Sequence, residues 1–480
     1  MINLTLLAPE LTLIGTGLAV LLIGLFLGTN AKKILGYLAS LGVLVSLVLV
    51  LMSLGREDML FNDTLSFDAL SQFFKLVFLS VALLVSIASI KYTEGNSHTE
   101  EFYSLMIFAT AGMMFVASAN DLIVLFVAFE LASLATYALA GFEKKNPISL
   151  EASIKYFMIG SLSAALMLFG ISFIYGATGT TSIPGVAENI DLLLGSPMGL
   201  LSAVLMIAGL GFKIALVPFH MWAPDTYQGS PSVVSSLLAA GSKKMGFVAA
   251  FKVFMIALIA LQAEWTTAFA VLAVITMTLG NVVALSQTSV KRMLAYSSVA
   301  QAGYIAMAFV VMSKTALAGA ILYALSHGFM KAGAFIATAA VVYMVLSEKK
   351  DSETPDDIDN FRGLGRRMPV TALCMTIFLF ALAGIPLTAG YMSKFVLFAS
   401  TIEAGLVWLA VIAILNSAIS LFYYAKVVKY MYFLPSDGEK ITEPIPYTFA
   451  MLIAVIFVLV IGFWSEPFLY WAMEAAKVLI

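Results

Sequence analysis

Charged side chains are scarce in this sequence. Only 11% of its 480 residues are Asp, Glu, Lys or Arg, whereas 61% are hydrophobic. Soluble domains carry about 25% charged residues, so this chain cannot cover a globular surface with polar groups. Its 26 basic and 28 acidic residues nearly cancel, which leaves no basic field to attract nucleic acid. The scarcity of charge excludes a soluble enzyme, a disordered chain and a nucleic-acid-binding protein.

Cysteine and histidine are also nearly absent. The single cysteine, Cys374, excludes a disulfide framework, a thiolate zinc site and an iron–sulfur cluster held by cysteines. His98, His220 and His327 are the three histidines, which argues against haem held by two of them. The sequence therefore predicts no metal site and no cofactor in this chain.

Long apolar runs fill most of the chain instead. A helix needs roughly 20 apolar residues to cross the hydrocarbon core, and these runs lack the alternating pattern of a barrel strand. We expect an all-α polytopic membrane protein with fourteen spans. They are expected at 4–27, 34–54, 68–90, 102–119, 121–141, 152–176, 198–219, 232–260, 265–287, 293–313, 315–346, 370–401, 405–433 and 447–473.

Positive residues are distributed unevenly between the loops. If the N-terminus lies outside, the inner loops hold thirteen Lys and Arg residues and the outer segments hold three. Cytoplasmic loops carry this excess in membrane proteins. The bias predicts a multi-pass protein of the cell membrane, inner or plasma, with both termini outside.

Several charged residues fall deep within the predicted spans. Each charge near the bilayer centre costs about 2.5–3.5 kcal/mol on insertion scales, so their presence indicates a function. Glu130 is the one acid that we expect in the middle of a span, and we expect it to pair with a buried lysine. The deep lysines, too far from the span ends to reach the headgroups, are Lys213, Lys243, Lys331 and Lys394.

Two further residues belong with these charges. His327 precedes Lys331 by four positions, so the two share one helix face. Both side chains can gain and lose a proton, which is typical of a proton path. Lys155 lies nearer the end of its span, where we expect it either to reach the headgroups or to pair with a cytoplasmic group.

Two prolines interrupt apolar runs, Pro218 in span 7 and Pro386 in span 12. Proline removes a helix hydrogen bond, and lipid tolerates the gap only where it lines protein or a wet cavity. The breaks lie five spans apart in helices of opposite direction, which predicts two inverted five-helix repeats with broken helices 7 and 12. We expect helices 1–3 at 1–101, the first repeat (helices 4–8) at 102–260, the second (helices 9–13) at 265–433, and helix 14 at 447–480.

The repeats can be aligned through two glycines. Gly112 and Gly280 stand in similar contexts, Thr-Ala-Gly-Met-Met-Phe-Val-Ala-Ser and Thr-Leu-Gly-Asn-Val-Val-Ala-Leu-Ser. This alignment places Ser298 opposite Glu130. The second repeat would then carry no acid of its own.

The motifs around these residues resemble the antiporter-like subunits of respiratory complex I, most closely the subunit N family. The resemblance covers essentially the whole chain. Its most specific stretch is Gly-Phe-Lys-x3-Val-Pro-Phe-His-x-Trp-x-Pro-Asp-x-Tyr-Gln-Gly-Ser-Pro at 211–231. Further matches are Leu-Ala-Tyr-Ser-Ser-Val-Ala-Gln-Ala-Gly-Tyr at 294–304 and Ala-Gly-Ile-Pro-Leu-Thr-Ala-Gly-Tyr-Met-Ser-Lys-Phe at 383–395.

The resemblance implies roles for individual residues. It makes Glu130 the span-5 glutamate and Lys213 its span-7 partner. Lys243 would be the span-8 lysine, Lys394 the terminal lysine of span 12, and Lys155 a span-6 lysine near the central axis.

One position departs from the family pattern. Lys244 follows Lys243, where a small residue is frequent. Adjacent helix positions are about 100° apart, so we expect one of the two lysines to face the axis, and we expect it to be Lys243.

The implied function is proton translocation within a redox-driven dehydrogenase, a translocase-class NAD(P)H- or deazaflavin-dependent quinone oxidoreductase. Electron transfer to quinone or phenazine, with flavin and iron–sulfur clusters, belongs to partner subunits in this interpretation. The expected partners are neighbouring antiporter-like and small membrane subunits and lipid, and no nucleic acid. Two alternatives stay open: a subunit of a multi-subunit sodium/proton antiporter without redox partners, and a scaffold that moves no ion.

Overall fold

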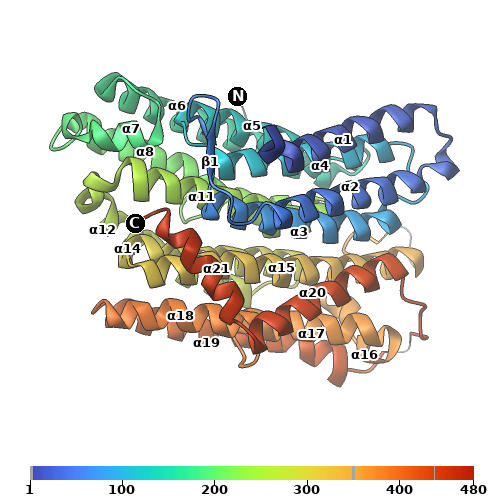
Figure 1. The fold of residues 1–480 in the computed structure, drawn as a ribbon. Helices are drawn as coiled ribbons and strands as arrows, with labels where there is room; N and C mark the ends of the chain where they lie inside the picture. The colour runs from blue at the N-terminus through green and yellow to red at the C-terminus, as the bar shows by residue number, and fades with distance from the viewer. Residues whose placement is uncertain (1–3, 349–351, 437) are drawn as a thin grey trace.

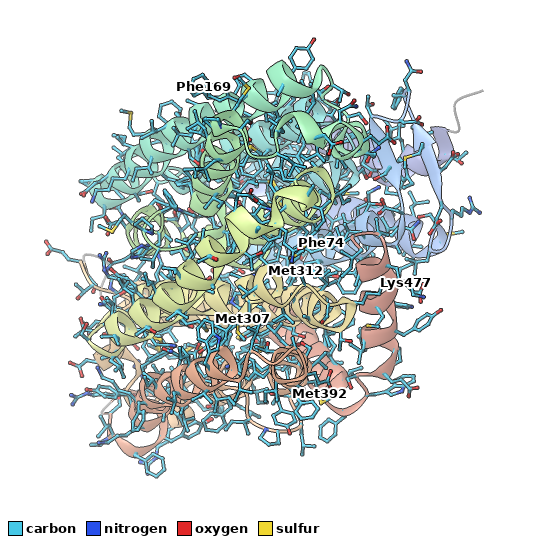
Figure 2. The ribbon with its side chains drawn as sticks, turned by 90° about the vertical axis from the view of Figure 1, so that its left-hand side faces the viewer. Phe74, Phe169, Met307, Met312, Met392 and Lys477 are labelled. Carbon is cyan, nitrogen blue, oxygen red and sulfur yellow. The ribbon has the colours of Figure 1, made fainter. Side chains whose placement is uncertain are left out.

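The computed structural model describes residues 4–348, 352–436 and 438–480. Its helices run side by side in one bundle (Figure 1). Within the described residues, twelve helices are long and apolar enough to cross a membrane. Large apolar side chains such as Phe169, which is 54% exposed, lie on the outer edge of the bundle (Figure 2). The predicted all-α polytopic architecture is confirmed.

The N-terminal unit consists of three helices and a small hairpin. An Asp68–Ser71 capping box starts the third helix: Asp68 Oδ1 accepts from the Ser71 amide at 2.7 Å, and Ser71 Oγ accepts from the Asp68 amide at 3.0 Å. The antiparallel hairpin precedes it. The bounds are η1 Leu4–Leu7, α1 Ala8–Phe26, η2 Thr29–Ala31, α2 Lys33–Met52, β1 Asp58–Leu60, β2 Leu65–Phe67 and α3 Ala69–Tyr92.

Predicted spans 4–8 follow in order. Spans 4–6 are continuous helices, whereas the chain of spans 7 and 8 is divided into several pieces. The bounds are α4 Thr99–Ser118, α5 Leu122–Ala140, α6 Pro147–Thr178, α7 Ile183–Glu188, η3 Ile190–Leu192, α8 Pro197–Ile214, α9 Trp222–Gly229, α10 Ser232–Leu237, the π-helical η4 Leu238–Ser242, α11 Lys243–Lys252, the π-helical η5 Val253–Ala257 and η6 Ile259–Leu261.

Predicted spans 9–14 form the rest of the bundle. The long helix α15 lies between α3 and α18, so it joins the two halves of the molecule (Figure 1). The bounds are α12 Gln262–Leu285, α13 Val290–Ala306, α14 Ala308–Val311, α15 Lys314–Glu348, η7 Ile358–Phe361, α16 Leu364–Arg367, α17 Pro369–Ala383, α18 Ala389–Glu403, α19 Val407–Phe433, α20 Ile445–Phe463 and α21 Glu466–Lys477.

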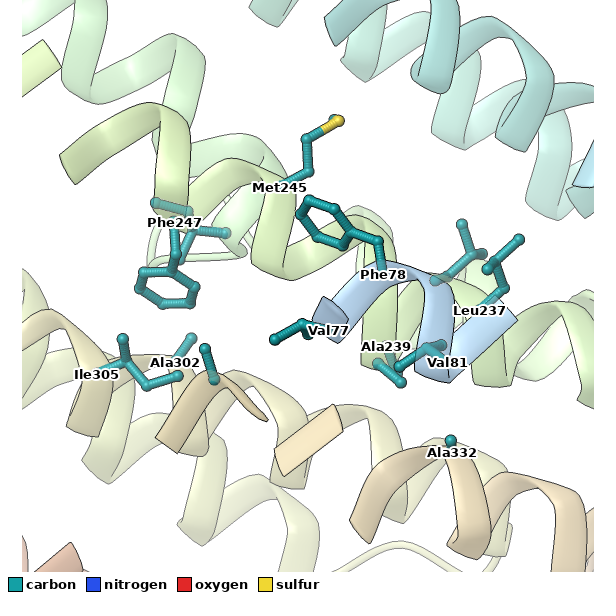
Figure 3. Close-up of a cluster of buried hydrophobic side chains, with 14 of the residues drawn as sticks. Val77, Phe78, Val81, Leu237, Ala239, Met245, Phe247, Ala302, Ile305 and Ala332 are labelled. Atoms are coloured by element: carbon teal, nitrogen blue, oxygen red, sulfur yellow. The ribbon is translucent and has the colours of Figure 1, made fainter. Parts of the chain in front are cut away.

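The central core forms around α3. Its residues Val77, Phe78 and Val81 are at most 1% exposed, and α3 packs against the η4–α11 segment and against α15 (Figure 3). Of the N-terminal unit, α3 therefore lies in the centre of the bundle, whereas α1 and α2 keep exposed outer faces.

The last predicted span is shorter than the sequence indicated. The apolar run 447–473 is not one helix, because α20 ends at Phe463 and the separate helix α21 begins at Glu466. Pro467 explains the division, since proline lacks the amide hydrogen that a continuing helix needs and is tolerated in a first turn. The predicted helix 14 at 447–480 is thus two helices.

Both predicted helix breaks are present. Helix α8 ends at Ile214, where Ala215 adopts a left-handed conformation with φ +61°, and the chain resumes as α9. Helix α17 ends at Ala383, followed by Gly384 with φ +90°, and resumes as α18. Each break frees backbone carbonyls near the middle of the bundle.

Span 8 contains a third interruption, which the sequence did not predict. The π-helical segments η4 and η5 lie on either side of α11. Because this segment contains no internal proline, the composition gave no signal for them. Such π-helical turns leave carbonyls available to side chains and occur frequently at functional sites.

The two aligned glycines lie at equivalent helix–helix contacts. A Cβ on Gly112 of α4 would lie 2.7 Å from the Ala132 nitrogen of α5, and one on Gly280 of α12 would lie 2.6 Å from the Ala300 nitrogen of α13. Both helix pairs therefore touch backbone to backbone at matching positions. The contacts agree with the predicted alignment, and the division into repeats stays a prediction.

Candidate functional site

Five lysines are buried along the interior of the bundle, and we refer to them as the lysine row. Each is at most 4% exposed. They come from α8, α11, α15 and α18, three of which adjoin a helix interruption. The lysine row comprises Lys213, Lys243, Lys244, Lys331 and Lys394.

Lys213 lies at one end of the row, in the last turn of α8. Its Nζ donates to Ser133 Oγ at 2.9 Å and to Tyr156 OH at 3.1 Å. The rings of Phe129, Tyr137 and Tyr156 surround the ammonium group, with centroids 5.4–5.7 Å away. These aromatic faces stabilise a cation without a counter-ion.

Glu130 is half-buried on α5, one turn before Ser133. The expected pair with Lys213 is not a direct contact: no ion pair within 4 Å joins Glu130 to Lys213 in the described structure, although both residues are part of it. Glu130 Oε1 is buried and has no hydrogen-bond partner among the described residues. The carboxylate therefore acts on Lys213 across a gap, with Ser133 beside it.

Lys243 and Lys244 begin α11, and both point into the interior. Lys243 Nζ donates to the carbonyl of Ser298 at 3.0 Å. Lys244 Nζ donates to the carbonyl of Ala239 at 3.0 Å and contacts His327 Nδ1. Every residue of α11 is buried, so Lys243 reaches α13 and Lys244 reaches α15. The role of Lys243 as the axial lysine stays a prediction.

Lys331 lies one turn beyond His327 on α15, as the spacing predicts. Its Nζ donates to the Leu294 carbonyl at 2.8 Å and to Ser297 Oγ at 2.7 Å. Ser297 is itself hydrogen-bonded to Tyr424 of α19. Helix α13 thus receives hydrogen bonds from Lys331 and, one residue beyond Ser297, from Lys243.

Lys394 forms the other end of the row, after the break between α17 and α18. Its Nζ donates to the carbonyls of Leu382 at 2.9 Å and Ala383 at 3.2 Å, and to Ser417 Oγ at 2.8 Å. These carbonyls are the ones freed at the end of α17, so the break itself supplies the acceptors. A cavity of about 440 Å³ reaches Lys394 from the side of the bundle.

Lys155 does not lie in the row. Its side chain is 43% exposed and forms ion pairs with Asp225 at 2.8 Å and Glu151 at 2.7 Å. Asp225 also pairs with Arg292 at 2.6 Å. Of the two environments that the sequence left open for Lys155, the structure shows pairing near the end of the span.

One fully buried acid was not predicted from the sequence. Glu10, in the first turn of α1, is 0% exposed and pairs with Lys75 of α3 at 2.7 Å. Lys75 also lies 3.9 Å from the centroid of the Phe67 ring. The sequence gives no signal for this pair, because helices α2 and α4, which pack against α1, and Lys75 of α3 are distant from Glu10 in the chain.

Unpartnered polar atoms cluster along the lysine row. Buried side-chain atoms without a hydrogen-bond partner in the described structure include Ser242 Oγ, Ser298 Oγ, His327 Nε2 and Tyr227 OH. Buried polar groups are normally hydrogen-bonded, to ordered water where protein offers nothing.

The groups that accept hydrogen bonds from the lysines determine which protonation states the site can hold. An ammonium group can only donate, whereas a hydroxyl can accept from an ammonium and donate to a neutral amine. Three lysines of the row meet hydroxyls, on Ser133, Tyr156, Ser297 and Ser417. Such lysines keep a hydrogen bond in both protonation states, as a proton relay requires.

The sequence places this architecture in a known family. Residues 119–420 match the family model described as NADH:quinone oxidoreductase/Mrp antiporter, TM. The chain belongs to this family. It is an antiporter-like membrane subunit of the complex I type, which confirms the predicted resemblance.

Similar proteins span the full length of the chain. It is 68% identical to F(420)H(2) dehydrogenase subunit N of Methanosarcina mazei, over 99% of this chain and 98% of that protein. NADH-quinone oxidoreductase subunit N of Trichlorobacter lovleyi is 38% identical over 100% of this chain and 98% of its own. A chain of respiratory complex I from Thermus thermophilus has a TM-score of 0.80 at 30% identity, covering 96% of this chain and 98% of that one. Complex I-type enzymes of this kind contain further membrane subunits, and their cofactors lie in other subunits.

Proposed function

We propose that this chain translocates protons within a redox-driven dehydrogenase and that the lysine row carries them. The observation that supports this function is the set of neutral acceptors: among the described residues, none of the five lysines has a carboxylate within 4 Å of its Nζ. Inserting each buried lysine costs about 2.5–3.5 kcal/mol, and a scaffold that moves no ion does not explain five of them.

The electron donor in this proposal is a reduced deazaflavin. The 68% identity to an F(420)H(2) dehydrogenase subunit supports it over NADH. Electrons would pass through flavin and iron–sulfur clusters of partner subunits to a quinone or phenazine. This chain would contribute the ion-moving part, in the cell membrane, with both termini outside as the distribution of loop charges predicts.

The proposed route runs from Glu130 to Lys394. At rest Glu130 favours the charged form of Lys213. When a change of charge nearby weakens that attraction, Lys213 releases its proton towards Lys243, and the proton passes the His327–Lys331 face to Lys394 and leaves on the outside. Moving one charge against 100 mV requires about 2.3 kcal/mol, which is comparable to the cost of burying one charge.

The test is proton pumping by the whole complex in sealed vesicles. We expect Glu130→Ala and Lys213→Met each to reduce pumping through this subunit by at least about tenfold while the complex assembles, since loss of a proton-transfer group typically costs about 10²–10⁴-fold. Lys429→Met, which removes an exposed lysine of α19, is the control and should pump normally. Normal pumping by Glu130→Ala would disprove the route.

A further inference from the structure

A large cavity opens at the end of the bundle where α13 begins. Its volume is about 980 Å³. Its walls come from the ends of α3 and α15, the start of α6 and the junction of α9 and α10. The wall includes Gln228, Gly229, Ser230 and Pro231, the last residues of the family motif at 211–231.

Acidic residues surround the cavity. Glu94, Glu143, Glu353 and Asp356 all line it. Hydrogen bonds from Lys91 and Lys33 lower the pKa of Glu94, which therefore stays ionised at the rim. Glu143 accepts from Tyr92 OH at 3.2 Å. Lys91, Lys145 and Lys291 line the same cavity, and Lys91 pairs with Glu94. The other three acids, Glu143, Glu353 and Asp356, are the acidic groups of the wall that can accept a hydrogen bond from hydronium.

Lys291 is the buried lysine of the cavity wall. It is 7% exposed, and its Nζ donates to the carbonyl of Ser230 at 2.5 Å, at the junction of α9 and α10. The route proposed above does not use Lys291. From the sequence, Lys291 is expected in an inner loop, as one of its positive charges. Within the described structure, Lys291 has no carboxylate within 4 Å of its Nζ, which is the feature shared by the lysine row.

Helix α13 connects Lys291 with two lysines of the row. One turn beyond Lys291, the Leu294 carbonyl and then Ser297 Oγ accept from Lys331. The next residue, Ser298, accepts from Lys243 through its carbonyl, and its own Oγ has no partner among the described residues. From Lys291 to Ser298 the helix rises by about 10 Å at 1.5 Å per residue.

We propose that this cavity is the proton-uptake site of the subunit and that Lys291 passes protons from its water to Lys331 and Lys243 along α13. The ammonium of Lys291 gives one proton to a water molecule beside Leu294 and Ser297. The resulting neutral amine takes one proton from hydronium in the cavity. This inference rests on the proposed function and identifies where its protons come from.

Variants of Lys291 test the proposal in vesicles that contain the whole complex. Lys291→Gln keeps a donor for Ser230 but carries no proton, and Lys291→Arg holds its proton too firmly to release it. Both should lower the proton-to-electron ratio and slow pumping by at least about tenfold. Lys291→His can titrate and should recover part of the rate. Lys144→Gln, which removes an exposed lysine outside the cavity wall, should pump like the wild type.

A purely structural role for Lys291 predicts the opposite order. If Lys291 only anchors the Ser230 carbonyl, Lys291→Arg should be the most active variant and Lys291→His no better than Lys291→Gln, and that result would overturn the proposal. Failure of the proposed function itself is distinguished by Lys213→Met in the same preparation: if Lys213→Met pumps normally, the row is not the route whatever the Lys291 variants do.

Access to the cavity can be tested without altering Lys291. In a Cys374→Ser background, Val342→Cys places a thiol on the cavity wall, and Val271→Cys places one on a surface that is 51% exposed on the side of the bundle. A charged, membrane-impermeant thiol reagent should modify Val342→Cys from one side only and slow pumping, and should leave Val271→Cys unmodified. An unreactive Val342→Cys, or modification that leaves pumping unchanged, would overturn the uptake site.

Discussion

Two regions of this molecule bury lysines in opposite ways. In the N-terminal unit, Lys75 is 2% exposed and meets the carboxylate of Glu10 at 2.7 Å. In the lysine row, Lys213 is equally buried but donates to Ser133 and Tyr156, with Glu130 outside direct contact. The first lysine meets an opposite charge, and the second meets hydroxyl groups that can hydrogen-bond to a lysine in either protonation state. The comparison separates a charge that stabilises the fold from a charge that can move.

The largest expected effect is on pumping, at the two adjacent lysines of the row, Lys243 and Lys244. Lys243→Ala and Lys244→Ala should each slow pumping by at least about tenfold, because each lysine supplies a separate contact, to Ser298 and to His327. Pumping and electron transfer are measured together in sealed vesicles. Normal pumping by Lys244→Ala would show that the route uses Lys243 alone, as the sequence predicted.

A smaller effect, on stability, is expected at the paired lysine. Glu10→Gln leaves Lys75 buried without its counter-ion and should destabilise the protein by about 3–5 kcal/mol, whereas Glu10→Gln combined with Lys75→Met should recover most of that loss. Thermal unfolding of the purified complex measures both. If instead Glu10→Gln remains stable and loses pumping, the pair belongs to the proton route and the comparison fails.

The smallest effect is expected at Lys155. The Lys155 side chain, which pairs with Glu151 and Asp225, is 43% exposed. Lys155→Gln should therefore change the free energy of unfolding by about 0.2–1 kcal/mol and leave pumping unchanged. The same vesicle and unfolding assays apply. A tenfold loss of pumping would instead support the axial role that the family resemblance implies for Lys155.

Hydrophobic run length and proline position predicted most of the architecture. Pro218 and Pro386 indicated both broken helices, because proline cannot continue a helix hydrogen-bond ladder. The π-helical segments beside α11 carry no such signal, so the third interruption and the inward position of Lys244 could not be predicted.

Burial of charge was harder to predict than the fold. Glu10 stands near a span end, and its environment depends on α2 and α4, which pack against α1, and on Lys75 of α3, all distant in sequence. Likewise, Lys291 looked like a loop cation until the junction of α9 and α10 placed Ser230 over it. The sequence identified the deep lysines because insertion cost depends on position along a span, whereas pairing depends on tertiary contacts.

The central claim is that the lysines of the row change their protonation state while the paired lysine does not. Arginine substitution tests it most directly, since arginine keeps the charge and does not release its proton. We expect Lys75→Arg, beside Glu10, to pump like the wild type, and Lys394→Arg, beside Ser417 and the freed carbonyls of α17, to stop pumping as completely as Lys394→Ala. Full proton pumping by Lys394→Arg in sealed vesicles would show that Lys394 is a fixed charge and would contradict the account.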